Sequence, residues 1–410
     1  MKRTGVPVSP GPSATRRSFL KKGAVTAGAA TIGVGLLGNS RRVYARDDDD
    51  DDSGSLTRGD AAILRFLQAL ETIEADLWRQ YAELGGAGPA TRGISPIDLP
   101  FPNGLADLYV TGLQQLDSDM PQYISDNTDD ELSHESFLKN YLQAKGADVV
   151  DLSKFATLQP SQVSGVPNTG RLTNLTQLTV DTTWWTRYRS STGNPDLGDV
   201  FPDNAVPDLA IHQHTAIPRT NQDLIADPNQ PGGVSKHTQA IANTAGFHFG
   251  FIEQGGSSLY PSLAQRVTSP RVLRILLSIG PTETSHFQTW HDKAGNAILL
   301  TDTDTGFPGS TGATVTFPNL SNPNFTPAEA DEFQANLIMP EPTFLLNKKF
   351  GSVSIIRPTA TKGAAMGALN SLTKDGLFIG HTSKSGKSDG FVELLTDLAE
   401  DADQARRGDF

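Results

Sequence analysis

Four segments of the chain carry apolar residues at helical spacing. The first begins at Thr57, where apolar residues recur at alternating steps of three and four, and it ends at Gly85-Gly86. The others cover roughly 118–145, 235–260 and 269–297, and the last opens with the serine–proline pair typical of a helix start. The pattern predicts a mainly α fold, an antiparallel four-helix bundle with a long crossover between the second and third helices.

The rest of the chain is irregular in pattern. The crossover, 147–234, is rich in Pro, Asn, Asp and Thr, and a strand-like piece lies around Leu175–Trp185. So long a connection is expected to pack as a structured flank on the bundle. We therefore expect a bundle at 57–300 with the inserted connection, and a C-terminal extension, 301–410, of loops, short strands and two small helices near 363–373 and 389–406.

The first 45 residues have the features of an export signal. Arg16-Arg17 precedes a mildly apolar stretch of about 16 residues, which is short for a membrane-spanning helix, and Val43-Tyr44-Ala45 suits cleavage. The pattern predicts a twin-arginine signal peptide at 1–45, read by the twin-arginine export machinery. The mature protein would then be periplasmic or extracellular, without a stable membrane anchor. An uncleaved N-terminal anchor is the alternative. Residues 46–56, with six consecutive aspartates, are expected to be a solvated linker.

Composition and charge limit the chemistry. The chain has no cysteine, so a metal would need oxygen and imidazole ligands, a set that suits iron or manganese. The net charge is −12, and removal of the eight Lys/Arg in residues 1–45, which contain no acid, takes it to −20. So acidic a surface argues against nucleic acid and anionic membranes as partners.

Two Glu-x-x-His pairs carry the candidate chemistry. Glu131 and His134 lie in the second helix, and Glu283 and His286 in the fourth. At positions i and i+3 both side chains project from one face, so each pair can hold one metal ion. The alternative is a pair of buried ion-pair networks without metal.

A bundle site also needs one carboxylate from each remaining helix. On the first helix, Glu74 lies on the apolar stripe and Glu71 lies off it, so Glu74 is the predicted ligand. On the third helix the only acid is Glu253. Glu74 and Glu253 are each followed seven residues later by a tyrosine, Tyr81 and Tyr260. The sequence thus has two helical hairpins with matching chemistry.

With these motifs the chain resembles the ferritin-like superfamily, and most closely its ferritin-like domain family that includes desiccation-related proteins. The resemblance rests on Asp130–Leu138 and on Glu283–His286, and it extends over about 57–297. It implies a di-iron or di-manganese centre, with Glu131 and Glu253 as the shared carboxylates. The implied ligands are Glu74, Glu131, His134, Glu253, Glu283 and His286.

The implied function is an exported two-metal protein: an oxidase, a ferroxidase or a peroxide-detoxifying protein, with O₂ or peroxide as partner. A metal-free structural or stress-protective protein that retains the bundle is the alternative.

Two features depart from ideal helices. Pro281 stands just before the fourth-helix motif and is expected to kink or break that helix, and Gly255-Gly256 should weaken the third helix beside Glu253.

Weaker candidates for chemistry remain. His212 and His214 could share one side of a strand, and Trp184-Trp185 could line an entrance, although packing of the connection is the simpler explanation. His248 and His291 lie off the proposed ligand faces, which predicts structural or solvent-facing roles.

Overall fold

The structure is a computed structural model of the 410-residue chain, and the described residues are 55–87, 104–187, 203–320, 337–338, 353–354, 363–381 and 388–408. All of them belong to one compact unit, Ser55–Phe410. The predicted signal peptide, 1–45, and most of the acidic linker lie outside the described residues. None of the helices in the described part of the chain is long and apolar enough to cross a membrane.

The described chain is mainly helical, as the sequence pattern predicts. Its α-helices are α3 (Arg58–Gly85), α4 (Asp107–Gln114), α5 (Met120–Ala144), α6 (Thr183–Arg187), α7 (Pro207–Ile211), α8 (Lys236–Ala264), α9 (Pro270–Ala294), α10 (Ala364–Lys374) and α11 (Phe391–Gln404). Short 3₁₀ turns cover Ser153–Phe155, Asn221–Asp223 and Pro231–Gly233. Two antiparallel strand pairs complete the described elements, β1 (Leu300–Thr303) with β2 (Thr314–Phe317) and β3 (Leu337–Ile338) with β4 (Val353–Ser354).

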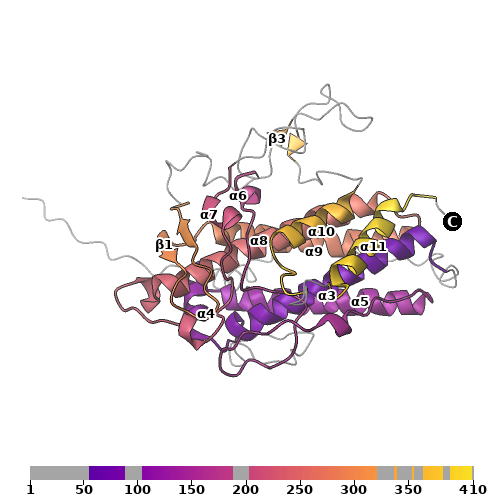
Figure 1. The fold of residues 1–410 in the computed structure, drawn as a ribbon. Helices are drawn as coiled ribbons and strands as arrows, with labels where there is room; N and C mark the ends of the chain where they lie inside the picture. Colours follow the sequence, from indigo (N-terminus) through magenta and orange to yellow (C-terminus); the bar gives the residue numbers. More distant parts are fainter. Residues whose placement is uncertain are drawn as a thin grey trace, which may run out of the picture. The chain divides into compact units, whose positions relative to one another are not determined.

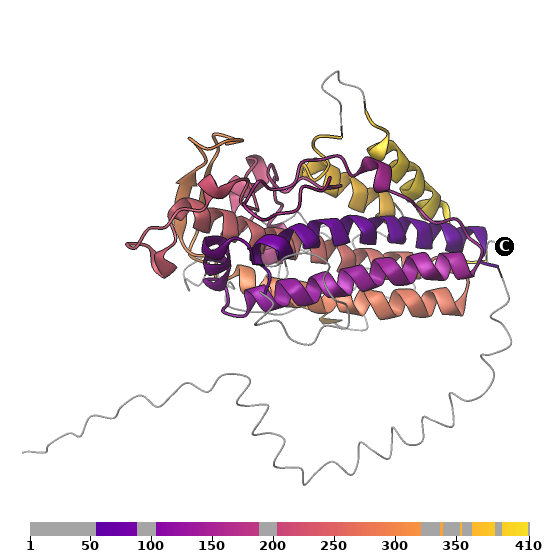
Figure 2. The same cartoon turned by 90° about the horizontal axis from the view of Figure 1, so that it is seen from below.

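The four long helices lie side by side (Figures 1 and 2). α3 packs on α5 and α8 packs on α9, each pair being a helical hairpin. α10 and α11 lie over α8 and α3 respectively, and Figure 2 shows them on the side of the long helices opposite to α5 and α9. The C-terminal extension therefore covers one side of the long helices.

Three side chains fix the starts of long helices. Thr57, Ser235 and Ser269 each accept a backbone N–H of the first turn of α3, α8 and α9. In addition, Asp60 in the first turn of α3 accepts the N–H groups of Thr268 and Ser269, at 2.8 and 2.9 Å. This carboxylate ties the start of one hairpin to the turn of the other.

The long connection is ordered by hydrogen bonds to α3. Asp76 of α3 accepts the backbone N–H groups of Leu172 and Thr173 and the Thr173 hydroxyl. The expected strand at Leu175–Trp185 does not form. Leu178 makes only an isolated bridge with His214, and the two tryptophans fall in the short helix α6. Long-range hydrogen bonds, rather than a ladder, satisfy this backbone.

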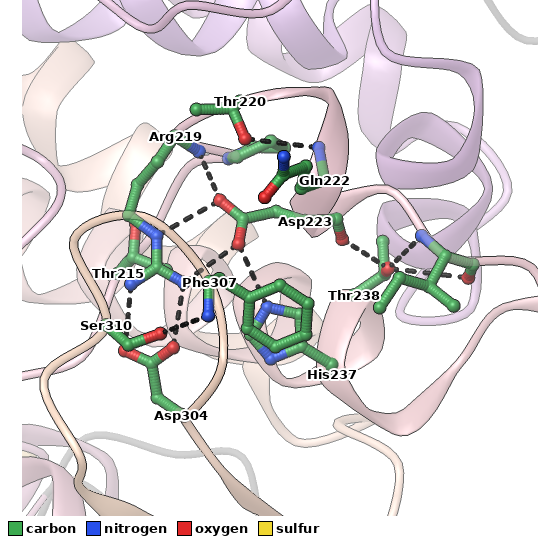
Figure 3. Close-up of polar contacts among 12 residues, drawn as sticks. Thr215, Arg219, Thr220, Gln222, Asp223, His237, Thr238, Asp304, Phe307 and Ser310 are labelled. Carbon is green, nitrogen blue, oxygen red and sulfur yellow. Dashed lines mark hydrogen bonds and ion pairs between the residues drawn. The ribbon is translucent and has the colours of Figure 1, made fainter.

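A buried ionic network joins the end of the connection to α8 and to the loop after β1 (Figure 3). Arg219 pairs with Asp223 at 2.8 Å and with Asp304 at 2.7 Å. His237 of α8 contacts Asp223 through Nε2 and Asp302 through Nδ1, and the Phe307 ring stacks on its imidazole. Paired charges thus hold the end of the connection and the start of α8 to the β1 region, which is distant in sequence.

Candidate metal centre

Six buried or nearly buried ligand-type side chains meet between the four long helices. They form two overlapping groups, Glu71–Glu131–His134–Glu283 and Glu131–Glu253–Glu283–His286, in each of which one ligand atom per residue lies within 4.8 Å of the others. α3 supplies Glu71, α8 supplies Glu253, and α5 and α9 each supply a Glu-x-x-His pair. The structure therefore brings the two motifs together.

The first group is arranged around His134. Its Nδ1 lies 3.4 Å from a Glu71 oxygen, 3.2 Å from a Glu131 oxygen and 3.2 Å from a Glu283 oxygen. Tyr260 of α8 donates its hydroxyl to the other oxygen of Glu71 and so orients that carboxylate.

The second group is arranged around His286. Its Nδ1 lies 3.2 Å from a Glu131 oxygen, 3.3 Å from a Glu253 oxygen and 3.9 Å from a Glu283 oxygen. The opposite ring nitrogen, Nε2, contacts Asp130 at 3.0 Å. A carboxylate behind the imidazole fixes the ring orientation and the tautomer that leaves Nδ1 facing the group.

Glu131 and Glu283 belong to both groups, with one oxygen toward each histidine. The resemblance implied that Glu131 and Glu253 are shared. In the structure Glu253 faces only the second group, and Glu283 takes the shared position. The two shared carboxylates come from the two Glu-x-x-His motifs, whereas the single-group carboxylates come from α3 and α8.

Asn127 supports the shared end of the site. Its side-chain N–H₂ donates to Glu131 at 2.9 Å and to Glu253 at 3.0 Å, and its oxygen accepts the indole N–H of Trp290 at 2.8 Å. Asn127 stands four residues before Glu131, so the helical spacing places both on one face of α5, but the spacing does not show which carboxylates the amide contacts.

The electrostatics of the site are those of crowded buried acids. Burial is the largest cause that raises the pKa of Glu71, of Glu253 and of Glu283, the last to about 8. Burial opposes protonation of His134, but contacts with the surrounding carboxylates outweigh it and raise its pKa. So many buried carboxylates need a compensating positive charge, which protons or metal ions can supply.

The donor set fits metal ions. Several ligand atoms are buried without a hydrogen-bond partner, namely Glu71 Oε2, Glu253 Oε2, both oxygens of Glu283 and His286 Nδ1. Neighbouring ligands at about 2.1 Å from a six-coordinate ion lie roughly 3.0 Å apart, and farther when the angle opens. The nitrogen–oxygen distances around His134, 3.2 to 3.4 Å, are close to that spacing, and around His286 two are 3.2 and 3.3 Å and the third is 3.9 Å. The buried groups can therefore hold a metal ion.

Glu74, the predicted α3 ligand, does not join either group, and this corrects the choice between the two acids. It is partly buried and lines a cavity of about 70 Å³ between α3, α8 and α10, with Leu70, Phe251 and Leu372 among its neighbours. Burial and the nearby carboxylates raise its pKa well above the ordinary value. The apolar stripe does not identify the ligand face of α3, because α3 is buried on several sides. Its apolar residues face α8 and α10 as well as the site.

The unusual residues of α8 and α9 do not break these helices. α9 continues through Pro281, which is exposed, and α8 continues through Gly255-Gly256 and through Pro261. A Cβ on Gly256 would lie 3.0 Å from a Glu283 oxygen, whereas a Cβ on Gly255 would meet nothing within 4 Å. Gly256 is thus the position where α8 makes room for a ligand of α9.

A groove between α5 and α9 reaches the first group from outside. It has a volume of about 810 Å³ and includes His134, Phe137, Arg271 and Arg274 in its lining. It opens on the side of the long helices that α10 and α11 leave uncovered.

The weaker candidates do not form sites. His212 is exposed and His214 is buried, where its Nδ1 contacts the Thr244 hydroxyl, so they do not share a ligand position. His248 and His291 are both buried, which excludes the solvent-facing alternative for each.

Comparison of the chain with known protein families, with curated proteins and with solved structures finds no match. The interpretation of the site therefore rests on its own residues.

Proposed function

We propose that the chain is an exported two-metal protein with a ferritin-like four-helix bundle, which reduces peroxide at a di-iron or di-manganese centre. The observation that carries the proposal is the pair of overlapping groups, in which two carboxylates are common to two histidine positions. Such sharing is what a centre with two adjacent ions requires. His134 and Glu71 would hold the first ion, His286 and Glu253 the second, and Glu131 and Glu283 would bridge them.

The surroundings favour a small neutral oxidant over a metal substrate. The groove that reaches His134 has the exposed Arg274 in its lining, and its positive charge disfavours entry of Fe²⁺. Peroxide and O₂ are not repelled. When bound, the two ions supply the two electrons that reduce peroxide to water.

The protein's own residues hold the ligands in place. Tyr260 donates its hydroxyl hydrogen to Glu71, and the side-chain amide of Asn127 donates to Glu131 and to Glu253. Both side chains restrain carboxylates that would otherwise repel each other. Folded export through the twin-arginine route would allow the metal to be loaded before translocation.

Metal stoichiometry tests the proposal. Metal-free protein titrated anaerobically with Fe²⁺ or Mn²⁺ should bind two ions per chain, and peroxide added to the loaded protein should oxidise them as it is consumed. Glu131→Gln should lose most of the bound metal, and Glu135→Gln, four residues on in the same helix, should not. Binding of less than one ion by the wild type would support the alternative, a metal-free structural or stress-protective protein.

A further inference from the structure

Tyr81 and His248 form an isolated polar pair inside the protein. The Tyr81 hydroxyl lies 2.6 Å from Nδ1 of His248, and both side chains are almost completely buried. The other imidazole nitrogen, Nε2, has no hydrogen-bond partner. A neutral His248 ring that carries its hydrogen on Nε2 can accept the phenol proton at Nδ1.

A continuous series of contacts connects this pair to the candidate metal centre. The Tyr81 ring lies 5.7 Å from that of Trp78, which stacks at 5.4 Å and 22° on Trp290. Trp290 donates its indole N–H to Asn127, which in turn donates to two carboxylates of the metal centre. Aromatic rings in contact lead from Tyr81 to within one side chain of the metal ligands.

Tyr109 and Trp184 lack this combination, and Tyr260 donates its hydroxyl directly to Glu71, a candidate ligand, instead of to a separate base. Tyr109 is as buried as Tyr81, but its hydroxyl donates to the backbone carbonyl of Ala216, which is not a base that can take the proton. Trp184 is as buried as Trp290, but it packs against Phe247, Phe287 and His291 instead of the Trp78–Tyr81 series. Tyr81 and Trp290 therefore differ from Tyr109 and Trp184 in the residues that they contact and not in how deeply they are buried.

We propose that Tyr81 and His248 are a redox-active pair that delivers one electron to the metal centre through Trp78 and Trp290. The step rests on the proposed function, because peroxide is the oxidant and the metal centre that it has oxidised is the electron acceptor. The Tyr81 O–H bond breaks as its electron leaves and its proton passes to Nδ1 of His248. The products are a neutral tyrosyl radical, an imidazolium ion and a centre reduced by one electron.

The surroundings of the pair suit this step and its reversal. Burial raises the pKa of Tyr81 well above 10, so the phenol is intact before it is oxidised. Burial lowers the pKa of His248 to about 3, so the resting ring is neutral and Nδ1 is free to accept. Because the buried imidazolium is disfavoured, the proton returns to Tyr81 once an electron is restored. The pair would return one electron to the centre after peroxide has oxidised it.

Electron paramagnetic resonance of protein frozen after peroxide addition tests the pair. Metal-loaded wild type should give a tyrosyl radical, and Tyr81→Phe should lose at least nine-tenths of that signal. Tyr109→Phe is the matched control and should keep it. Trp290→Phe should slow radical formation at least tenfold, whereas Trp184→Phe should not. An undiminished signal in Tyr81→Phe, or no radical in loaded wild type that consumes peroxide, would overturn the proposal.

A second measurement separates this proposal from the metal assignment. In metal-free protein, photogenerated ruthenium(III) tris-bipyridine can oxidise aromatic side chains, and Tyr123, partly exposed with its ring 6.3 Å from Trp290, gives it an entry. Tyr81→Phe should lower the tyrosyl yield and Tyr109→Phe should not. His248→Gln keeps an acceptor for the hydroxyl but no base, and should slow radical formation at least tenfold. If the chain binds no metal but Tyr81→Phe still lowers the tyrosyl yield in this experiment, the two-metal function is rejected and the redox pair is not. Equal yields and rates in all variants would reject the redox pair.

Discussion

The adjacent glycines of α8 allow the site geometry to be tested with one methyl group. In the middle of a helix, replacement of Gly by Ala stabilises the fold by roughly 0.5–1 kcal/mol through backbone entropy alone. At Gly255 the added Cβ meets nothing within 4 Å, so Gly255→Ala should show this gain and nothing else. At Gly256 the same Cβ would lie 3.0, 3.1 and 3.3 Å from Oε2, Cγ and Cβ of Glu283, so the carboxylate must shift.

The loss of metal-dependent stability expected for Gly256→Ala follows from the shared position of Glu283. Small displacements of a ligand or of its support weaken metal binding by about 10- to 100-fold. Metal-dependent stabilisation follows the logarithm of the dissociation constant, so Gly256→Ala should lose about 1.4–2.7 kcal/mol of it per ion affected. Both ions should be affected, because Glu283 belongs to both groups.

Denaturant unfolding of six samples measures these effects: wild type and each variant, without metal and with Mn²⁺ at a fixed excess. Gly255→Ala should be more stable than wild type by the same amount in both states. Without metal, Gly256→Ala should keep part of the stabilisation that comes from backbone entropy. With metal, it should be less stable than wild type. Equal metal-dependent stabilisation in the two variants would refute the placement of Gly256 against a ligand.

Three further predictions follow from single side chains. Glu71→Gln should lower the bound metal by about one ion per chain while Glu74→Gln leaves it unchanged, as elemental analysis would show; the reverse result would restore Glu74 as the ligand. His237, whose contacts with Asp223 and Asp302 outweigh burial and raise its pKa from 6.5 to about 9, should stabilise the fold fully below pH 6.5 and lose that contribution as the pH rises through 9. His237→Gln should remove this fall in the free energy of unfolding, measured between pH 6 and pH 10, and an unchanged slope would count against it. Pro281→Ala should stabilise the fold by up to about 3 kcal/mol, because Pro281 is exposed in a continuous helix, without a change in metal affinity; weaker binding would show that the proline shapes the site.

The parts of the fold that local sequence determines were predictable. Caps such as Thr57, Ser235 and Ser269 mark helix starts because a short side chain must satisfy free N–H groups there. The Glu-x-x-His motifs specify their own geometry, because the helix places i and i+3 on one face. Helix existence and the pairing of acid with imidazole are therefore readable from spacing.

Other features depend on contacts that spacing does not contain. The choice between Glu71 and Glu74 is decided by α10, which covers the α3–α8 seam from more than 100 residues away in sequence. The strand-like piece at Leu175–Trp185 forms no ladder, because the N–H groups of Leu178, Thr179 and Val180 donate to three separate segments, at His214, Asp375 and Leu209. A sequence pattern identifies buried positions but not which of several neighbours buries them.

The two tyrosines show how a repeated sequence acquires different roles. Each follows an acid of its helix by seven residues, and the repeat predicts equivalent surroundings. In the structure Tyr260 reaches across to Glu71 and restrains one carboxylate of the first group, whereas Tyr81 turns to His248. The equivalent position beside Glu253 is taken by Asn127, which is also the contact point of Trp290. Asn127 thus supports Glu253 where the repeat would place Tyr81, and through Trp290 and Trp78 it connects Tyr81 to the candidate metal centre. The asymmetry of the ligand supports and the proposed electron path thus have the same structural origin.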